Sequence, residues 1–153
     1  MTYAAVRPDA WNFPLFLHVL GATVLVALLA VAAVVLVAAR RAGDDRTATV
    51  RLAFRTLLIG AIPAYIVMRA GAEWIVDKES LTDSKASWIG IGRGVADGGM
   101  LVLIVLTVLA GLAYRRARRG GEPLTLVRWA TGLTLLLIVA YGVALWAMAT
   151  KPV

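Results

Sequence analysis

The amino-acid sequence predicts an all-α fold, a four-helix transmembrane bundle with antiparallel, up-and-down helices and both termini on the extracytoplasmic side. Three observations lead to this prediction. The 153 residues are 61% hydrophobic and 16% charged, whereas soluble domains are about half apolar and a quarter charged. The apolar residues form four long runs, and arginines gather in two of the connections between them. We therefore expect one membrane domain over residues 1–153, embedded in a lipid bilayer.

Four segments are long enough to cross a hydrocarbon core of about 30 Å, which takes roughly 20 helical residues. The first carries no charge from Ala10 to Ala39 and is much longer than the roughly 7–15 apolar residues of a signal peptide. The second and third each contain one arginine and one carboxylate but are otherwise apolar. The predicted spans are Trp11–Ala39, Thr56–Val76, Trp88–Tyr114 and Leu126–Thr150.

The charges of the connections predict the orientation. The first connection holds five arginines against Asp44 and Asp45, and the third, with its flank, holds five arginines against Glu122. The second connection, residues 77–87, holds two lysines against three acidic residues. Because short cytoplasmic loops are rich in arginine and lysine, we expect the first and third connections in the cytoplasm. Both termini and the second connection then lie on the opposite side.

Aromatic residues support the same register. Indole rings prefer the membrane interface because they combine an apolar body with one hydrogen-bond donor. Four tryptophans fall at the predicted extracytoplasmic ends of the four spans: Trp11, Trp74, Trp88 and Trp146. Tyr114 and Trp129 fall at cytoplasmic ends.

Small residues and a proline mark two spans. Gly90, Gly94 and Gly98 share one helix face, and small residues at this spacing let two backbones approach closely in lipid. We expect this face to pack against a neighbour, or to leave room for a ligand. Pro63 interrupts the second span, where it leaves the carbonyl of Ile59 without a helical partner and is expected to kink the helix.

Composition and missing motifs exclude several functions. The formal net charge of +7 would suit nucleic acid in a soluble protein, but topology explains the basic residues here, so no nucleic-acid partner is expected. The chain has no cysteine, which excludes disulfides, thiolate metal sites and iron–sulfur clusters. It also has no phosphate-binding loop and no zinc-protease motif. We expect no enzymatic activity.

Five ionisable residues interrupt the predicted spans, and all of them lie in the extracytoplasmic half of the membrane. Charge within a membrane is costly and is found facing a bundle interior or a wet cavity. The five residues therefore predict one polar cluster, a candidate ligand-binding pocket that opens to the extracytoplasmic side: His18, Arg69, Glu73, Arg93 and Asp97.

Spacing allows two sets of partners within this cluster. Arg69 and Glu73 are four residues apart, as are Arg93 and Asp97, so each pair can close within its own helix. In antiparallel helices, Arg69 also lies at the depth of Asp97. Glu73 likewise lies at the depth of Arg93, so two cross-helix pairs can form instead. In either set the four charges sum to zero, as a buried network requires, and spacing does not decide which carboxylate pairs with which arginine. These ion pairs either fix the register in which the helices pack, which we call a structural lock, or form a site that contacts a ligand, ion or proton.

His18 is the only histidine, and a neutral imidazole has the capacity to bind metals. It is either a histidine satisfied by one hydrogen bond or an axial haem or metal ligand. Met68, Met100 and Met148 lie in the same membrane half. Histidine with thioether sulfur suits Cu(I) or haem iron, so these four residues are the candidate metal ligands. One histidine excludes bis-histidine haem within one chain, although two chains could share one haem.

Two short segments resemble a known family. The first span opens with Phe16-Leu17-His18-Val19-Leu20-Gly21-Ala22, and the chain ends with Trp146-Ala147-Met148-Ala149-Thr150-Lys151-Pro152 before its last valine. Both resemble small bacterial membrane proteins related to the copper-resistance D family. The resemblance implies a four-helix unit in the bacterial cytoplasmic (inner) membrane, with His18 near the outer face and a link to copper. The chain differs from a copper transporter in lacking further histidines and a dense methionine cluster.

Three functions are consistent with these features. The first is a membrane binding or accessory protein whose polar pocket holds a small ligand or a partner. The second is a haem- or copper-binding membrane redox protein that uses His18, and the third is a structural subunit of a larger membrane complex. Four spans are few for a transporter with its own pathway, so we expect a homo-oligomer or a larger assembly.

Overall fold

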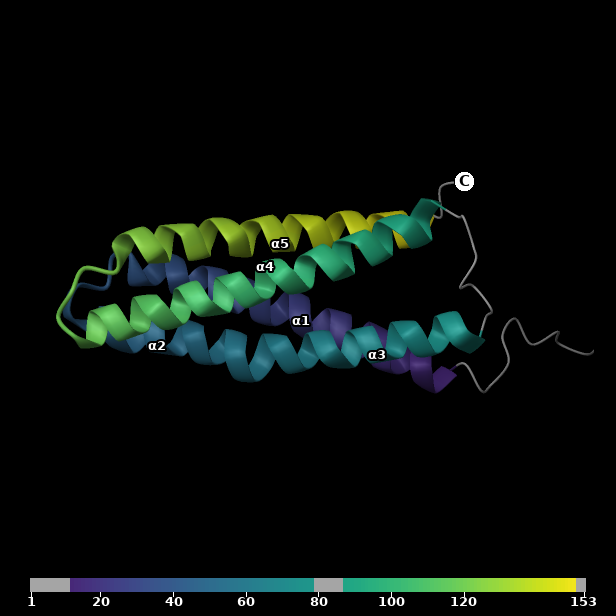
Figure 1. Cartoon of the computed structure of the whole chain (residues 1–153), viewed down its shortest axis with the longest axis horizontal. Coiled ribbons are helices and arrows are strands. Elements are labelled where there is room, and N and C mark those ends of the chain that lie inside the picture. Colours follow the sequence, from purple (N-terminus) through teal and green to yellow (C-terminus); the bar gives the residue numbers. More distant parts are fainter. Residues whose placement is uncertain (1–11, 79–86, 151–153) are drawn as a thin grey trace, which may run out of the picture.

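The computed structural model describes residues 12–78 and 87–150, and the regular structure of this part of the chain is entirely helical (Figure 1). Four helical rods are long and apolar enough to cross a membrane. The first is α1 (Asn12–Ala39), and the last two are α4 (Ser87–Arg118) and α5 (Leu124–Thr150). The second rod consists of α2 (Arg46–Arg55), a π-helical stretch (Thr56–Ala61) and α3 (Ile62–Lys78).

The helices extend beyond the predicted spans on the side of the arginine-rich connections. The second rod begins at Arg46, so the 10 residues of α2 are helical rather than part of a long loop. Helix α4 likewise continues through Arg118. These stretches contain alanine, leucine and arginine, which are good helix formers, and they contain no proline. Only the apolar part of each rod has to match the thickness of the membrane.

The kink predicted at Pro63 takes the form of a wide turn. Over Thr56–Ala61 the backbone is π-helical, and the N–H of Ile62 donates to the carbonyl of Leu57, five residues earlier. A proline has no N–H, and its ring clashes with the carbonyl four residues before it in a regular α-helix. The wider turn relieves this conflict within the rod, as single π turns do inside α-helices.

The bundle is built from two closely packed helix pairs. Helix α1 packs against α3, and α4 packs against α5, while α1 also contacts α5 and α2 contacts α4. In contrast, α3 and α4 scarcely touch, and they diverge towards the end of the bundle where α3 ends and α4 begins (Figure 1). We call this the open end. The opposite end, with the connections 40–45 and 119–123, is the arginine end.

The core holds the two pairs together from the middle of the bundle to the arginine end. It combines alanines, which bring backbones close, with fully buried leucines. Because lipid is as apolar as leucine, this core stabilises the bundle through close packing rather than through removal from water. Many large apolar side chains lie on the outside, as a surface in contact with lipid requires. The fully buried leucines are Leu25, Leu29, Leu36, Leu57, Leu103, Leu106 and Leu137.

Glycine shapes the helix packing at positions other than those predicted. A Cβ built on Gly90, Gly94 or Gly98 meets no described atom within 4 Å. This face therefore packs against no described residue of the chain, and the expected packing is absent within it. The close contact lies between α1 and α3 instead. A Cβ on Gly21 would collide with the backbone of Met68, and one on Gly71 would lie 2.5 Å from the backbone nitrogen of His18.

The described tryptophans lie on the surface near helix ends. Trp74 and Trp146 are exposed towards the open end and Trp129 towards the arginine end. Trp11 lies outside the described residues, as does the side chain of Trp88. Most charges of the second connection, including Lys85, also lie outside them.

Candidate functional site

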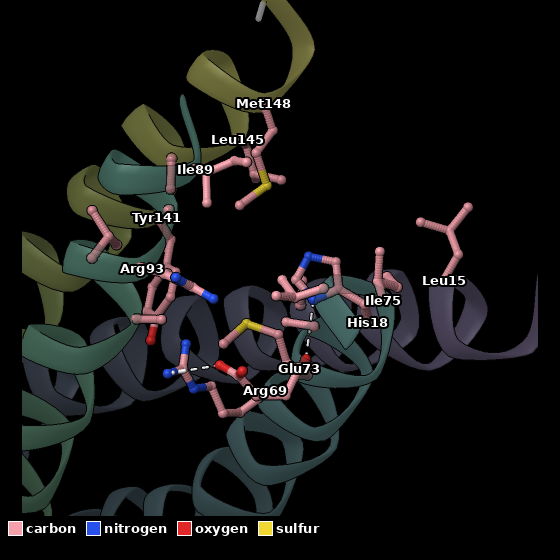
Figure 2. A pocket seen from close by; sticks show the side chains of 18 of the residues that line it. Leu15, His18, Arg69, Glu73, Ile75, Ile89, Arg93, Tyr141, Leu145 and Met148 are labelled. Carbon is pink, nitrogen blue, oxygen red and sulfur yellow. Dashed lines mark hydrogen bonds and ion pairs between the residues drawn. The ribbon is translucent and has the colours of Figure 1, made fainter. Parts of the chain in front are cut away.

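A cavity opens between the two helix pairs at the open end. Its volume is about 260 Å³, slightly below the range of about 300–1,000 Å³ that is typical of small-molecule sites. All four rods contribute to its wall, and Figure 2 shows the side chains around it. The divergence of α3 from α4 creates this space. The wall is mainly apolar, with residues such as Leu15, Val26, Ile75, Ile89 and Leu145.

Four of the five predicted pocket residues line this cavity: His18, Arg69, Glu73 and Arg93. Asp97 does not line it, but its carboxylate lies 2.9 Å from Arg69 Nη2. The structure therefore brings the predicted polar cluster together, from α1, α3 and α4. It is a narrow polar zone in an otherwise apolar cavity, the arrangement that orients a ligand in many binding sites.

Arg69 binds both carboxylates of the cluster. Its Nη2 atom lies 2.9 Å from Glu73 Oε1 within α3 and 2.9 Å from Asp97 Oδ1 across on α4. Of the pairs that spacing allows, the within-helix pair Arg69–Glu73 and the cross-helix pair Arg69–Asp97 both form. The cross-helix pair of Glu73 with Arg93 does not form, because Glu73 binds Arg69. The physical reason is the divergence of α3 from α4 towards the open end, which is the end on which Glu73 and Arg93 lie.

Arg93 is consequently left without a counter-ion. Its side chain reaches from α4 into the cavity (Figure 2). Across residues 12–78 and 87–150 it makes neither an ion pair nor a hydrogen bond. A guanidinium group is always charged and offers five N–H donors. In a mostly apolar cavity, such a group is a site for an acceptor that the protein itself does not provide.

His18 is held in a defined orientation. Its Nδ1 lies 3.0 Å from the carbonyl oxygen of Met68, and the contact of Gly71 with its backbone brings α1 close enough for this bond. If Nδ1 carries the proton, Nε2 is left as an acceptor or ligand atom. Figure 2 shows the imidazole of His18 on the cavity wall, with one ring nitrogen in the dashed hydrogen bond and the other on the opposite side of the ring. This single hydrogen bond is what the structural interpretation of His18 expects, and the metal-ligand interpretation stays a prediction.

The candidate metal ligands are brought together only in part. Met68 and Met148 line the cavity together with His18, but Met100 does not; it packs against the core. Of the candidate metal ligands, Met100 therefore lies apart from the other three. The described part of the chain also contains no group of three or more histidine, aspartate and glutamate side chains that could hold a metal ion.

Sequence reasoning missed two tyrosines beside the cluster. Tyr65 is buried and donates a hydrogen bond of 3.0 Å to the carbonyl oxygen of Ala96, which joins α3 to α4. Tyr141 lines the cavity from α5 and is only 6% exposed. Its hydroxyl finds no hydrogen-bond partner among the described residues. Both could have been noticed, because Tyr65 precedes Arg69 by one turn and Tyr141 lies well inside the fourth span.

Comparison of the chain with protein-family models, curated proteins and solved structures gave no match. The resemblance to the copper-resistance D family is tested by none of these comparisons, and it stays a prediction. The function is therefore argued from the site alone.

Proposed function

We propose that this chain is a multi-pass membrane binding protein whose cavity holds a small apolar molecule with one acidic group. The four rods then run antiparallel, up and down, through a bacterial cytoplasmic membrane. The arginine end faces the cytoplasm, and the open end, with both termini, faces the extracytoplasmic side. A homo-oligomer or a larger complex would place this cavity beside a partner that uses or supplies the ligand.

One observation carries this proposal: Arg93 projects into an apolar cavity without a counter-ion, although two carboxylates lie close by. Both carboxylates bind Arg69 instead. Their side chains are 49% and 65% exposed, so water or headgroups solvate their remaining charge. Arg93 is therefore the cation available to an incoming anion. Hydrogen bonds between ionised groups are roughly twice as strong as neutral ones.

The apolar walls of the cavity indicate that the part of the ligand beyond its acidic group is apolar. Apart from the polar zone, the cavity presents aliphatic side chains from all four helices. A hydrophilic anion would gain nothing from these walls and would lose its hydration. A short alkyl or aryl acid would place its acidic group at Arg93 and its body against the aliphatic wall. This arrangement supports the binding interpretation over a purely structural lock, which would pair Arg93 with a carboxylate.

Thermal unfolding with decanoate and decanol as probes tests the proposal. The two molecules share an alkyl chain and differ in charge. We expect decanoate to raise the melting temperature of the detergent-solubilised protein and decanol to leave it nearly unchanged. Arg93→Gln should abolish the shift by decanoate, and Arg51→Gln should retain it. Arg51 is a matched control because it is exposed on α2, far from the cavity.

Mass spectrometry of the purified protein provides a second readout. Solvent extracts of wild type and Arg51→Gln should contain a co-purified acid that is depleted from extracts of Arg93→Gln. Equal stabilisation by decanoate and decanol would overturn the role of charge. An unchanged decanoate response in Arg93→Gln would overturn the assignment of the site.

A haem or copper site is a second candidate, supported by the orientation of His18. Metal-binding histidines commonly donate their other ring N–H to a carbonyl oxygen, and Nδ1 of His18 is in place to do so with Met68. Met68 and Met148 would be its thioether partners. This candidate predicts a Soret band, or one iron or copper per chain or per dimer, that is lost in His18→Ala. A colourless, metal-free wild-type protein would exclude it and leave the acid-binding proposal standing.

A further inference from the structure

We infer that a second site, at the arginine end, binds the phosphate group of an anionic phospholipid of the surrounding bilayer. A hollow of about 280 Å³ lies there, between the end of α1 and the start of α5. Its lining consists of Val37, Arg40, Arg41, Leu124 and Arg128. Arg40 and Arg41, in the turn directly after α1, and Arg128 of α5 therefore meet around one hollow, and no carboxylate lines it.

The three guanidinium groups are free to bind an anion. Within the described residues, the side chains of Arg40, Arg41 and Arg128 make no ion pair and no hydrogen bond. The acidic residue of the neighbouring connection is already engaged. Glu122 pairs with Arg46 at 3.2 Å and accepts a hydrogen bond from the backbone N–H of Leu124, also at 3.2 Å.

The connections hold this arrangement in place. Arg46 also donates to the carbonyl of Ala39, the last residue of α1. Arg46 thus joins the end of α1 to Glu122, and Glu122 in turn caps the start of α5. Gly120, with a φ of +74°, supplies the left-handed turn that α4 needs before α5. The two helix ends that carry the arginines are tied by this Arg46–Glu122 contact.

The chemistry of the hollow favours a phosphodiester. A guanidinium group forms bidentate hydrogen bonds with two phosphate oxygens. Three guanidinium groups offer more N–H donors than one carboxylate can accept. The hollow lies at the ends of two membrane-spanning helices, at the depth of lipid headgroups. Val37 and Leu124 give it apolar sides next to the acyl region, and the exposed indole of Trp129 marks the interface. Basic pockets between membrane helices bind anionic headgroups in this way.

Native mass spectrometry of the detergent-solubilised full chain tests this inference. The probes are dioleoylphosphatidylglycerol, dioleoylphosphatidylcholine and inorganic phosphate. The test variant combines Arg40→Gln, Arg41→Gln and Arg128→Gln. The matched control combines Arg51→Gln, Arg118→Gln and Arg119→Gln, which removes the same charge from exposed positions outside the hollow.

We expect one phosphatidylglycerol to remain bound to wild type and to the control, with about tenfold or greater weakening in the test variant. Phosphatidylcholine should bind much more weakly, and inorganic phosphate should not displace the lipid. Equal weakening in the control would show that net charge alone attracts the lipid and would overturn the site. Efficient displacement by inorganic phosphate would instead identify a site for free phosphate and overturn the assignment to lipid.

Discussion

Arg69 joins the two helix pairs of this protein through Asp97: its Nη2 atom on α3 lies 2.9 Å from Asp97 Oδ1 on α4. Among the described residues, no other ion pair crosses between the pairs at the open end. The hydrogen bond from Tyr65 to Ala96 crosses at nearly the same depth. Beyond these two contacts α3 and α4 diverge, so they mark the floor of the cavity on this side.

The two partners of this ion pair should differ in their effect on stability. Arg69→Gln leaves two carboxylates close together without a cation, and we expect it to lower the free energy of unfolding by about 1–3 kcal/mol. Asp97→Asn leaves Arg69 bound to Glu73, and its cost should stay below about 1 kcal/mol. Reversible unfolding in mixed detergent micelles measures both. Equal costs would contradict a shared arginine.

Removing Arg93 should hardly affect folding. Since it makes no contact with a described carboxylate, Arg93→Gln should change the free energy of unfolding by less than about 0.5 kcal/mol. A double-mutant cycle of Arg93→Gln with Glu73→Gln should give a coupling energy near zero. The cycle of Arg69→Gln with Asp97→Asn provides the positive control, with a coupling of about 0.5 kcal/mol or more. A comparable coupling energy in both cycles would show that Arg93 and Glu73 interact and would support the structural-lock interpretation.

Two glycines on different helices should respond in opposite ways to alanine. Gly71→Ala places a Cβ 2.5 Å from the backbone of His18, so α1 must move, at a cost of about 1–3 kcal/mol. Gly94→Ala meets nothing within 4 Å and adds helix propensity of up to about 1 kcal/mol. Melting temperatures of the two variants give the comparison. A destabilised Gly94→Ala would indicate that a neighbour outside this chain packs there.

The two tyrosines offer a matched pair of hydroxyl deletions. Tyr65→Phe removes the hydrogen bond to Ala96 and should cost about 0.5–1.5 kcal/mol. Tyr141→Phe removes a buried hydroxyl that has no described partner, so it should be neutral or stabilising. The measurement is again unfolding in detergent. A loss of stability in Tyr141→Phe would reveal a partner for this hydroxyl, such as water in the cavity.

Much of the architecture follows from residue patterning. Long apolar runs bounded by arginines predict four spans, and four membrane-length helices are present. The depth of the ionisable residues predicts their assembly, because charge along one helix must meet charge or water at the same level. On this basis five residues are expected at one pocket: His18, Arg69, Glu73, Arg93 and Asp97. The first four line the cavity, whereas Asp97 does not line it and instead binds Arg69.

Other features depend on helix geometry that single residues do not encode. The divergence of α3 from α4 decides that Glu73 binds Arg69 and leaves Arg93 free, and spacing alone allows either pairing. The Gly90, Gly94 and Gly98 series has the regular spacing of a packing face, yet the close contacts lie at Gly21 and Gly71. Which glycine face meets a neighbour depends on how each helix is rotated, and this rotation results from the packing of the whole bundle.

The wide turn at Thr56–Ala61 determines the direction in which Arg69 leaves its helix. A π turn takes up about one extra residue, which shifts the phase of α3 relative to α2 by about 100°. In an unbroken α-helix, Arg69 would point about 100° around the axis from the buried Val50. With the shift, the two side chains leave the rod in the same direction, and Arg69 reaches Asp97 on α4. Pro63 maintains the shift. A chain in which Pro63 is replaced and one residue of this turn is deleted would keep Arg69 facing Asp97. A chain in which Pro63 alone is replaced, so that the turn becomes α-helical, would turn Arg69 away.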